Sequence, residues 1–182
     1  MPEVEQLDGR HQRSARSRAA VVEATLDLIR ERGEQPSAQE IADRAGVSLR
    51  TVFRHHDDMD SLLATALAHQ MQRVGHLFEP LAPMPVEQFV AHRRELFEDI
   101  TNVRRAALVH ANRTVVRNGL ADAHRRLRAQ LQSVFDVDGA TLEALDATTS
   151  WATWDTLRRD QGLSADDAEA IVVHMIRRVL EA

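Results

Sequence analysis

The chain has 182 residues, a formal net charge of −5 and 43% hydrophobic residues. This length is sufficient for one domain, or for two small ones, with a sizeable buried core. Because the chain contains no cysteine, disulfide bonds, thiolate catalysis and thiolate metal sites are excluded. Aromatic residues make up only 4% of the chain, and Ala, Leu, Arg and Glu are abundant, so the composition favours an all-α fold.

The net charge is unevenly distributed along the chain. Residues 1–9 carry three acids and no base, whereas residues 10–56 carry nine arginines against six acids, a net charge of +3. Residues 57–182 carry fourteen arginines against nineteen acids, a net charge of −5. Binding to a phosphate backbone needs local positive charge rather than a basic whole protein. This division therefore favours a small basic region that faces nucleic acid, joined to a larger acidic region.

The N-terminal segment is rich in arginine and serine. It lacks the apolar core of a signal peptide, and no later stretch reaches the roughly 18 apolar residues of a membrane span. We therefore expect a soluble, cytoplasmic protein with no membrane partner, in which residues 1–16 form a flexible basic arm. Arg10, Arg13, Arg16 and Arg18 either enter a DNA minor groove or belong to a segment that is merely disordered.

The first predicted helix runs from near Ser17 to near Gly33. A broad apolar face at helical spacing supports it, made of Val21, Val22, Thr25, Leu26, Leu28 and Ile29. The segment from Ser37 to Glu40 then forms a capping box, in which the serine hydroxyl and the glutamate carboxylate each satisfy a free backbone N–H. This capping box opens a second, short helix.

A third short helix is expected directly after a tight turn. Gly46 supplies the left-handed conformation that ends the second helix, and Ser48 caps the third, which runs to about His55. Three helices joined in this way, within residues 17–59, predict a helix-turn-helix domain whose third helix is the recognition helix.

The rest of the chain, residues 60–182, is predicted to be a helical body. Its expected helices cover residues 60–78, 85–101, 103–118, 120–134, 139–161 and 164–181. Prolines within residues 80–85 separate the first two, because proline suits a first helical turn and not a helix interior. Asp138 is expected to cap the penultimate helix, and Ser164 the last one. The predicted fold is all-α, with about nine helices in total.

The segment from Gly33 to Leu63 combines several short motifs at a specific spacing. They are Ile41-Ala42, Ala45-Gly46-Val47-Ser48, Thr51-Val52-Phe53-Arg54-His55 and Leu62-Leu63. In residue type and spacing this segment resembles the DNA-binding domain of the TetR family of regulators. The stretch from Trp154 to Ser164, followed by an apolar helix, is similar to that family's last two helices. The resemblance implies a homodimeric transcriptional regulator, a repressor released from its operator by a small-molecule inducer.

Three positions depart from the family pattern. A tyrosine is usual where Phe53 stands, an aromatic residue such as phenylalanine where His56 stands, and a lysine where Met59 stands. In the family the tyrosine hydroxyl and the lysine commonly contact phosphate. Two backbone contacts are therefore in question, and either the affinity is lower or the arginines of the arm compensate.

The recognition helix is expected to face the DNA groove with polar or flexible side chains and to keep apolar ones behind. Val47, Val52 and the body of Phe53 are expected to pack toward the first two helices. Arg50 is the expected base reader, since a guanidinium can bond O6 and N7 of guanine together, and Leu49 is expected to contact a thymine methyl group. The expected DNA-binding residues are Arg18, Ser37, Ser48, Leu49, Arg50, Thr51, Phe53, Arg54 and His55, of which Ser37, Thr51 and His55 are expected to contact phosphate.

The middle of the chain mixes apolar, histidine and arginine positions on several helices. Phe78, Phe97, His110 and Arg113 are candidates for a ligand pocket between helices, which is where helical bundles hold ligands. Ordinary core packing is the alternative for each of them taken singly. An inducer pocket in this region is implied by the resemblance.

The last two predicted helices carry more apolar residues than one buried face needs. This excess width indicates contact with a second subunit, and the resemblance implies a symmetric dimer through a four-helix bundle. The expected interface residues are Trp151, Trp154, Ile171, Met175 and Val179. The alternative is a tightly wrapped monomer core.

No residue pattern points to catalysis, a metal or another cofactor. Within His55-His56-Asp57-Asp58, neighbouring helical side chains point about 100° apart and cannot converge on one ion. No Ser/His/Asp set, glycine-rich phosphate loop or paired-carboxylate motif stands out, so an enzyme is not expected. Two alternatives remain open. One is a helical ligand-binding or interaction protein with a degenerate helix-turn-helix that no longer binds DNA, and the other is a small all-α enzyme.

Overall fold

The computed structural model describes residues 3–109 and 114–182, and the side chains in these ranges other than those of residues 3–11 and residue 115. Every regular element in this part of the chain is a helix or helical turn, so the predicted all-α fold is confirmed. No helix within it is both long and apolar enough to cross a membrane.

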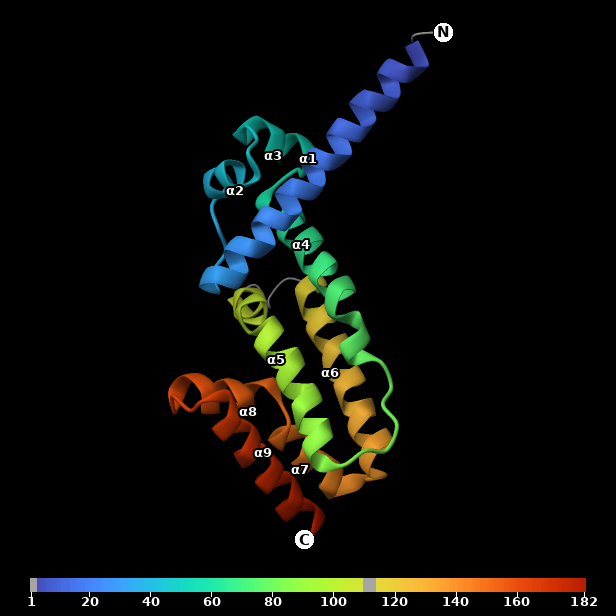
Figure 1. Cartoon of the computed structure of the whole chain (residues 1–182), viewed down its shortest axis with the longest axis vertical. Coiled ribbons are helices and arrows are strands. Elements are labelled where there is room, and N and C mark those ends of the chain that lie inside the picture. Colours follow the sequence, from blue (N-terminus) through green and yellow to red (C-terminus); the bar gives the residue numbers. More distant parts are fainter. Residues whose placement is uncertain (1–2, 110–113) are drawn as a thin grey trace. The chain divides into compact units, whose positions relative to one another are not determined.

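The helices form two compact units. In chain order (Figure 1) they are α1 (Glu3–Arg32), α2 (Ala38–Ala45), α3 (Leu49–His55), α4 (Met59–Val74), the 3-10 turn η1 (Gly75–Phe78), α5 (Val86–Val109), α6 (Thr114–Phe135), α7 (Gly139–Thr148), α8 (Trp151–Asp155), the π turn η2 (Thr156–Asp160) and α9 (Ala165–Leu180). Unit 1 is Met1–Arg73 with Asn102–Val116, and unit 2 is Val74–Thr101 with Arg117–Ala182. The predicted division by role, into an arm, a DNA-binding domain and a body, stays a prediction.

Helix α1 begins much earlier than expected. It starts at Glu3, so the predicted start near Ser17 is wrong. No proline interrupts the chain between these two positions, and the alanine, arginine and glutamine residues that precede Ser17 are good helix formers. The helix therefore includes residues 3–16, which had been expected to form a flexible arm.

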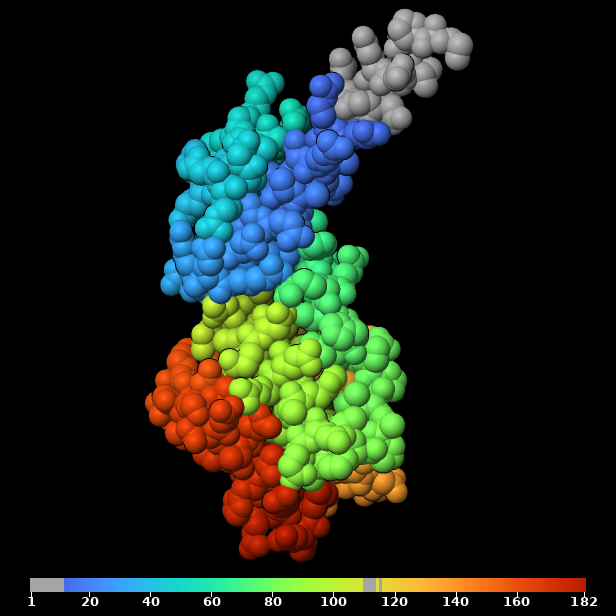
Figure 2. Space-filling model, in the orientation of Figure 1, coloured from blue at the N-terminus to red at the C-terminus, as the bar shows by residue number. Residues whose placement is uncertain are grey.

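The core of unit 1 holds α2 and α3 against α1, and Figure 2 shows α2 and α3 lying against α1. Its buried residues come from α1 to α4 and are Val21, Val22, Ala24, Leu26, Leu28, Ile41, Ala42, Val52, Leu62 and Ala66. Burying a side chain such as Ile41, which is 0% exposed, contributes about 1.5–3 kcal/mol. A second cluster of Ile29, Leu63, Val103 and Ala106 ties the last turns of α5 to α1 and α4.

Two predicted helix breaks are absent. Helix α5 continues through Asn102, and α6 continues through Gly119, so the expected helices 85–101, 103–118 and 120–134 are replaced by two longer ones. Asn102 does not end α5, because its side-chain amide donates to the carbonyl oxygen of Arg30 in α1. Gly119 is exposed and costs the helix only about 1 kcal/mol relative to alanine, which is too little to stop it.

The expected helix over residues 139–161 is interrupted. Helix α7 ends at Thr148, and Ser150 starts α8 by accepting a hydrogen bond from the backbone N–H of Thr153 at 3.1 Å. The hydroxyl of Thr149 meanwhile donates to the carbonyl oxygen of Leu145 at 2.8 Å. Asp138 does stand at the N-cap position of α7, although its side chain makes no capping hydrogen bond.

Candidate nucleic-acid interface

The turn between α2 and α3 has the expected geometry. Ser37 and Glu40 form a complete capping box: the backbone N–H of Ser37 donates to the glutamate carboxylate at 2.8 Å, and the N–H of Glu40 donates to the serine oxygen at 3.3 Å. Gly46 adopts φ +65° at the end of α2, and the oxygen of Ser48 accepts from the N–H of Thr51 at 3.2 Å. The predicted helix-turn-helix is thus present.

The capping box also fixes a charge at the start of α2. The backbone N–H of Ser37 and then the guanidinium of Arg32 lower the pKa of Glu40 to about 2. Arg32 donates to the carboxylate at 2.5 Å. Glu40 therefore stays ionised throughout the neutral pH range, and the Ser37 hydroxyl, which also bonds its carboxylate, is already engaged.

Helix α3 presents one buried face and one exposed face. Val52 is 1% exposed and packs into the core of unit 1, with the partly buried Val47 beside it. The outer face holds Leu49, Arg50, Phe53 and Arg54, all exposed. Phe53 is 45% exposed, so the expectation that its body packs toward the first two helices is wrong. It follows Val52 by about 100° around the helix, which turns it away from the core.

The arginines of unit 1 fall into two groups. Arg30, Arg32 and Arg44 pair with Asp27, Glu40 and Glu31 at 3.2, 2.5 and 2.8 Å. By contrast, Arg50 and Arg54 on α3 and Arg18 on α1 are exposed and form no ion pair with any residue that the structure describes. The uncompensated positive charge of this unit therefore includes the outer face of α3.

Arg18 lies close to the C-terminal end of α3, although it is far from α3 in the sequence. Burial first, and then the charges of Arg54 and Arg18, lower the pKa of His55. Burial, Arg18 and His55 likewise lower the pKa of His56, which is 5% exposed. Arg18, Arg54 and His55 thus gather at one end of the recognition helix. Sequence reasoning had named all three for DNA contact, but it missed their proximity.

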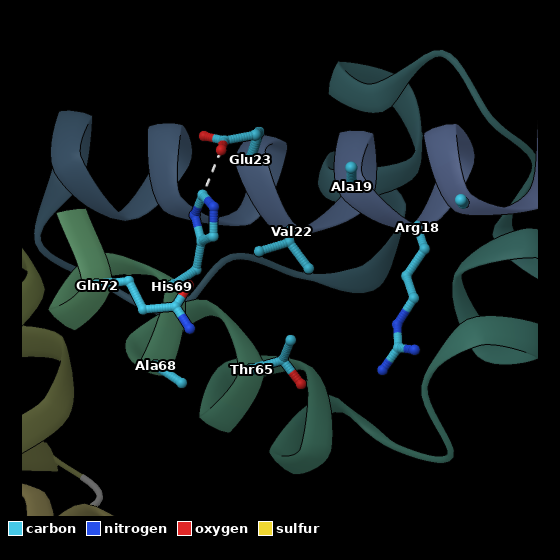
Figure 3. A pocket seen from close by; sticks show the side chains of 9 residues that line it. Arg18, Ala19, Val22, Glu23, Thr65, Ala68, His69 and Gln72 are labelled. Atoms are coloured by element: carbon cyan, nitrogen blue, oxygen red, sulfur yellow. Dashed lines mark ion pairs between the residues drawn. The ribbon is translucent and has the colours of Figure 1, made fainter. Parts of the chain in front are cut away.

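A groove of about 360 Å³ runs between α1 and α4 next to Arg18. Figure 3 shows the Arg18 side chain at one end of this groove and the Glu23–His69 ion pair, 3.3 Å long, at the other. Small side chains line most of the space between them, among them Ala15, Ala19, Thr65 and Ala68. The groove therefore leaves open space beside the Arg18 side chain.

The positions that depart from the family pattern have clear locations. His56 is buried where an aromatic residue was expected, and its Nε2 has no hydrogen-bond partner within the described part of the chain. Met59 is partly buried against the core of unit 1. Neither side chain is fully exposed.

The other predicted site residues lie in unit 2 or outside the described residues. Phe78 and Phe97 are 3% and 1% exposed, while His110 and Arg113 belong to the segment that is not described. Both tryptophans are buried within the chain: the indole N–H of Trp151 donates to Thr101, and that of Trp154 to Glu98. On α9, Ile171 is 36% exposed and Met175 and Val179 are half-buried, so this helix keeps apolar surface on its outside.

Residues 21–66 match the model of a family described as bacterial regulatory proteins, tetR family. No curated protein matches the sequence. Among solved structures, a tetR-family transcriptional regulator from Streptomyces coelicolor is 20% identical with a TM-score of 0.72, over 89% of this chain and 81% of that one. A TetR-family regulator from Mesorhizobium loti MAFF303099 is 19% identical with a TM-score of 0.66, over 93% and 97%. A regulator from Aquifex aeolicus VF5 is 16% identical with a TM-score of 0.64, over 90% and 99%.

The two kinds of match agree with the geometry of the site. The family match spans the C-terminal half of α1, all of α2 and α3 and the first half of α4, which are the elements that position the recognition helix. The structural likeness extends over most of the chain and shows the fold. The helix-turn-helix segment of this chain therefore matches the tetR family of bacterial regulatory proteins, and the chain has the fold of solved transcriptional regulators of that family.

Proposed function

We propose that this protein is a transcriptional regulator that reads a double-stranded operator through α3. The observation that carries the proposal is the outer face of that helix, where Arg50 and Arg54 are exposed and unpaired within the described residues. The buried Val52 holds this face in place. Positive charge without a protein partner is available to phosphates and to base edges.

The contacts divide into base readers and backbone contacts. We assign Arg50 to a guanine, and Leu49, which is 39% exposed, to a thymine methyl group. Arg54, His55 and Arg18 gather at the end of α3 and are assigned to phosphates. Ser37 needs to rotate its hydroxyl away from Glu40 before it can donate to a phosphate.

We further propose that the protein acts as a homodimer. Ile171, Met175 and Val179 supply the apolar outer surface of α9, which has no partner within the described part of the chain beyond its own unit. A two-fold dimer places two recognition helices roughly 34–36 Å apart, which suits two half-sites one DNA turn apart. The operator is then expected to be palindromic.

More specifically, we propose a repressor that a small molecule releases from its operator. A ligand that binds preferentially to the conformation that does not bind DNA lowers the affinity for the operator. By linkage, operator DNA lowers the affinity for the ligand by the same factor. Unit 2, with the buried Phe78 and Phe97, is where we place this ligand.

The test of the regulator is a gel-shift titration on the DNA flanking its own gene, at a stated low salt concentration. A sequence-selective shift is expected, because specific and non-specific binding differ by a factor of about 10³ or more. The absence of any selective shift would favour the alternative, a helical interaction protein with a degenerate helix-turn-helix.

The role of Arg50 can be separated from general charge by a matched pair of variants. Arg50→Ala is expected to lose about 1–3 kcal/mol of operator binding and to relax the preference at one base pair. Arg44→Ala removes an equal charge from the same unit, but that arginine is paired with Glu31, so little change is expected. Equal losses in the two variants, spread over all sequences, would refute the assignment of Arg50 as a base reader.

A further inference from the structure

Arg93, in the middle of α5, is a buried arginine with most of its donors unused. The side chain is 2% exposed. One of its terminal nitrogens, Nη2, donates to the carbonyl oxygen of Leu127 in α6 at 2.6 Å, and its guanidinium carbon lies 4.9 Å from the centre of the Phe89 ring. Its Nε and Nη1 atoms have no hydrogen-bond partner among the residues that the structure describes. A buried charge in this condition is costly unless something pairs with it.

No carboxylate of unit 2 neutralises this cation directly. The one acid whose charge acts on Arg93 is Asp146, and Asp146 already accepts from His124 at 2.8 Å and from Arg128 at 3.3 Å. Burial lowers the pKa of Arg93 to about 9, so the guanidinium still carries its charge at neutral pH. Arg93 is therefore a buried cation without a direct ion pair among the described residues.

A second buried polar group lies one helical turn from the Leu127 carbonyl. Gln130 is 1% exposed, and its amide nitrogen donates to the carbonyl oxygens of Leu77 at 3.0 Å and Glu79 at 2.6 Å. These two bonds fix the orientation of the amide, and its oxygen is left without a partner among the described side chains and backbone. Arg93 therefore contacts α6 within one helical turn of Gln130.

We propose that Arg93 and Gln130 form the polar end of a binding site in unit 2 for a small organic acid that carries a carboxylate together with a hydroxyl group. The carboxylate accepts from the unused N–H groups of Arg93 and supplies the missing negative charge. The hydroxyl donates to the Gln130 oxygen, and the buried Phe89 and Phe97 offer an apolar and aromatic surrounding for the carbon skeleton. Only the step of naming this acid as the effector of operator release rests on the proposed function.

Comparing Arg93 with its neighbour provides a matched control. Arg94 is the same residue type, one position along α5, but it reaches the surface and pairs with Asp166 at 2.6 Å and Glu169 at 2.7 Å. Arg94→Met therefore removes a compensated charge, whereas Arg93→Met replaces an uncompensated one with an apolar side chain of similar length.

The experiment measures thermal unfolding and calorimetric binding of the full chain with 4-hydroxybenzoate, benzoate and the uncharged benzamide. We expect 4-hydroxybenzoate and benzoate to raise the midpoint temperature and benzamide to leave it unchanged. In Arg93→Met the affinity for benzoate is expected to fall at least tenfold, whereas Arg94→Met keeps it. Equal effects of benzoate and benzamide, or an unchanged benzoate affinity in Arg93→Met, would overturn the proposal.

The ligand-free variants exclude a purely structural role for Arg93. If the role of Arg93 is to bind a ligand anion, Arg93→Met is expected to unfold at the same temperature as the parent chain or at a higher one, since it removes a buried charge. A large fall in its midpoint temperature, or a failure to fold, would assign Arg93 to the structural bond with Leu127 and contradict the proposal. Gel shifts with the parent chain separate this proposal from the proposed function. If the chain binds its operator but does not prefer benzoate to benzamide, the acid site is refuted and the regulator is not. If it prefers benzoate to benzamide but binds no operator, the regulator is refuted and the acid site is not.

Discussion

Single arginines of this protein differ in whether an acid neutralises them, and that difference determines what each of them can bind. The charge of Arg44 is offset by its ion pair with Glu31, whereas Arg50 has no acidic partner among the described residues. Arg93 and Arg94 repeat the contrast inside unit 2. The sequence does not reveal it, because each pair consists of identical residue types and the acids that neutralise them are distant along the chain.

Acidification is expected to destabilise unit 1 through His56. In the folded chain burial lowers the pKa of His56, and Arg18 and His55 lower it further, whereas the unfolded chain keeps the ordinary value of about 6.5. Below that pH the unfolded chain binds more protons than the folded one, so the free energy of unfolding falls. Stability is thus retained above about pH 6.5 and lost as the pH falls from there through the folded pKa.

Urea unfolding followed by the helical circular dichroism signal, from about pH 7.5 to about pH 5, measures this dependence. His56→Phe is expected to reduce the slope, because the phenylalanine fills a buried site without a titrating group, and His55, whose pKa is also lowered, accounts for a remaining part. His174→Phe, at an exposed position of α9, is expected to leave the slope unchanged. An unchanged slope in His56→Phe would mean that other groups cause it.

Helix ends were predictable in this chain where they depend on local hydrogen bonds. Ser37, Gly46 and Ser48 act as expected because each cap involves partners within a few residues. Breaks inside the longer helices were not predictable. Helix α5 continues through Asn102 because a distant carbonyl, that of Arg30, accepts from its side chain, and no local pattern contains that information.

Replacing glycine by alanine is expected to change the stability of the chain in opposite directions at two positions. Gly46 has φ +65° with no atom near the position of an added Cβ, so Gly46→Ala is expected to cost about 1–2 kcal/mol through backbone strain alone. Gly119 lies within α6 with equally open surroundings, and Gly119→Ala is expected to stabilise the chain by about 0.5–1 kcal/mol. Chemical denaturation measures both, and a gain at Gly46 would contradict the left-handed turn.

At the scale of the whole molecule, the helical fold and the helix-turn-helix were predictable, and the division into compact units was not. Apolar periodicity and the motifs from Ile41 to Leu63 identify the elements. The units depend instead on which buried faces meet, such as Val103 and Ala106 of α5 against Ile29 of α1. Such contacts join residues that are far apart in the sequence and leave no local trace.

Dimerisation through α9 is expected to be sensitive to charge at Ile171. This side chain is 36% exposed, so Ile171→Glu costs the folded protomer little but places a carboxylate in the proposed interface. We expect the dimer dissociation constant to rise about tenfold or more, which corresponds to about 1.4 kcal/mol. Analytical ultracentrifugation measures it, with Ala170→Glu on the same helix as the control. An equal effect of both variants, or none, would place the interface elsewhere.

The positions of Trp151 and Trp154 make intrinsic tryptophan fluorescence a probe of unit 2. The chain has two tryptophans and no tyrosine, and both indoles lie in unit 2, bonded to Thr101 and Glu98. Near-ultraviolet emission therefore originates in unit 2, and the helix-turn-helix contributes no such signal. A change in emission when an acid is added reports an event in unit 2. Operator binding that affects only the helix-turn-helix leaves the emission spectrum unaltered. Acid binding in unit 2 can thus be followed by intrinsic fluorescence in the presence of operator DNA, without an attached dye.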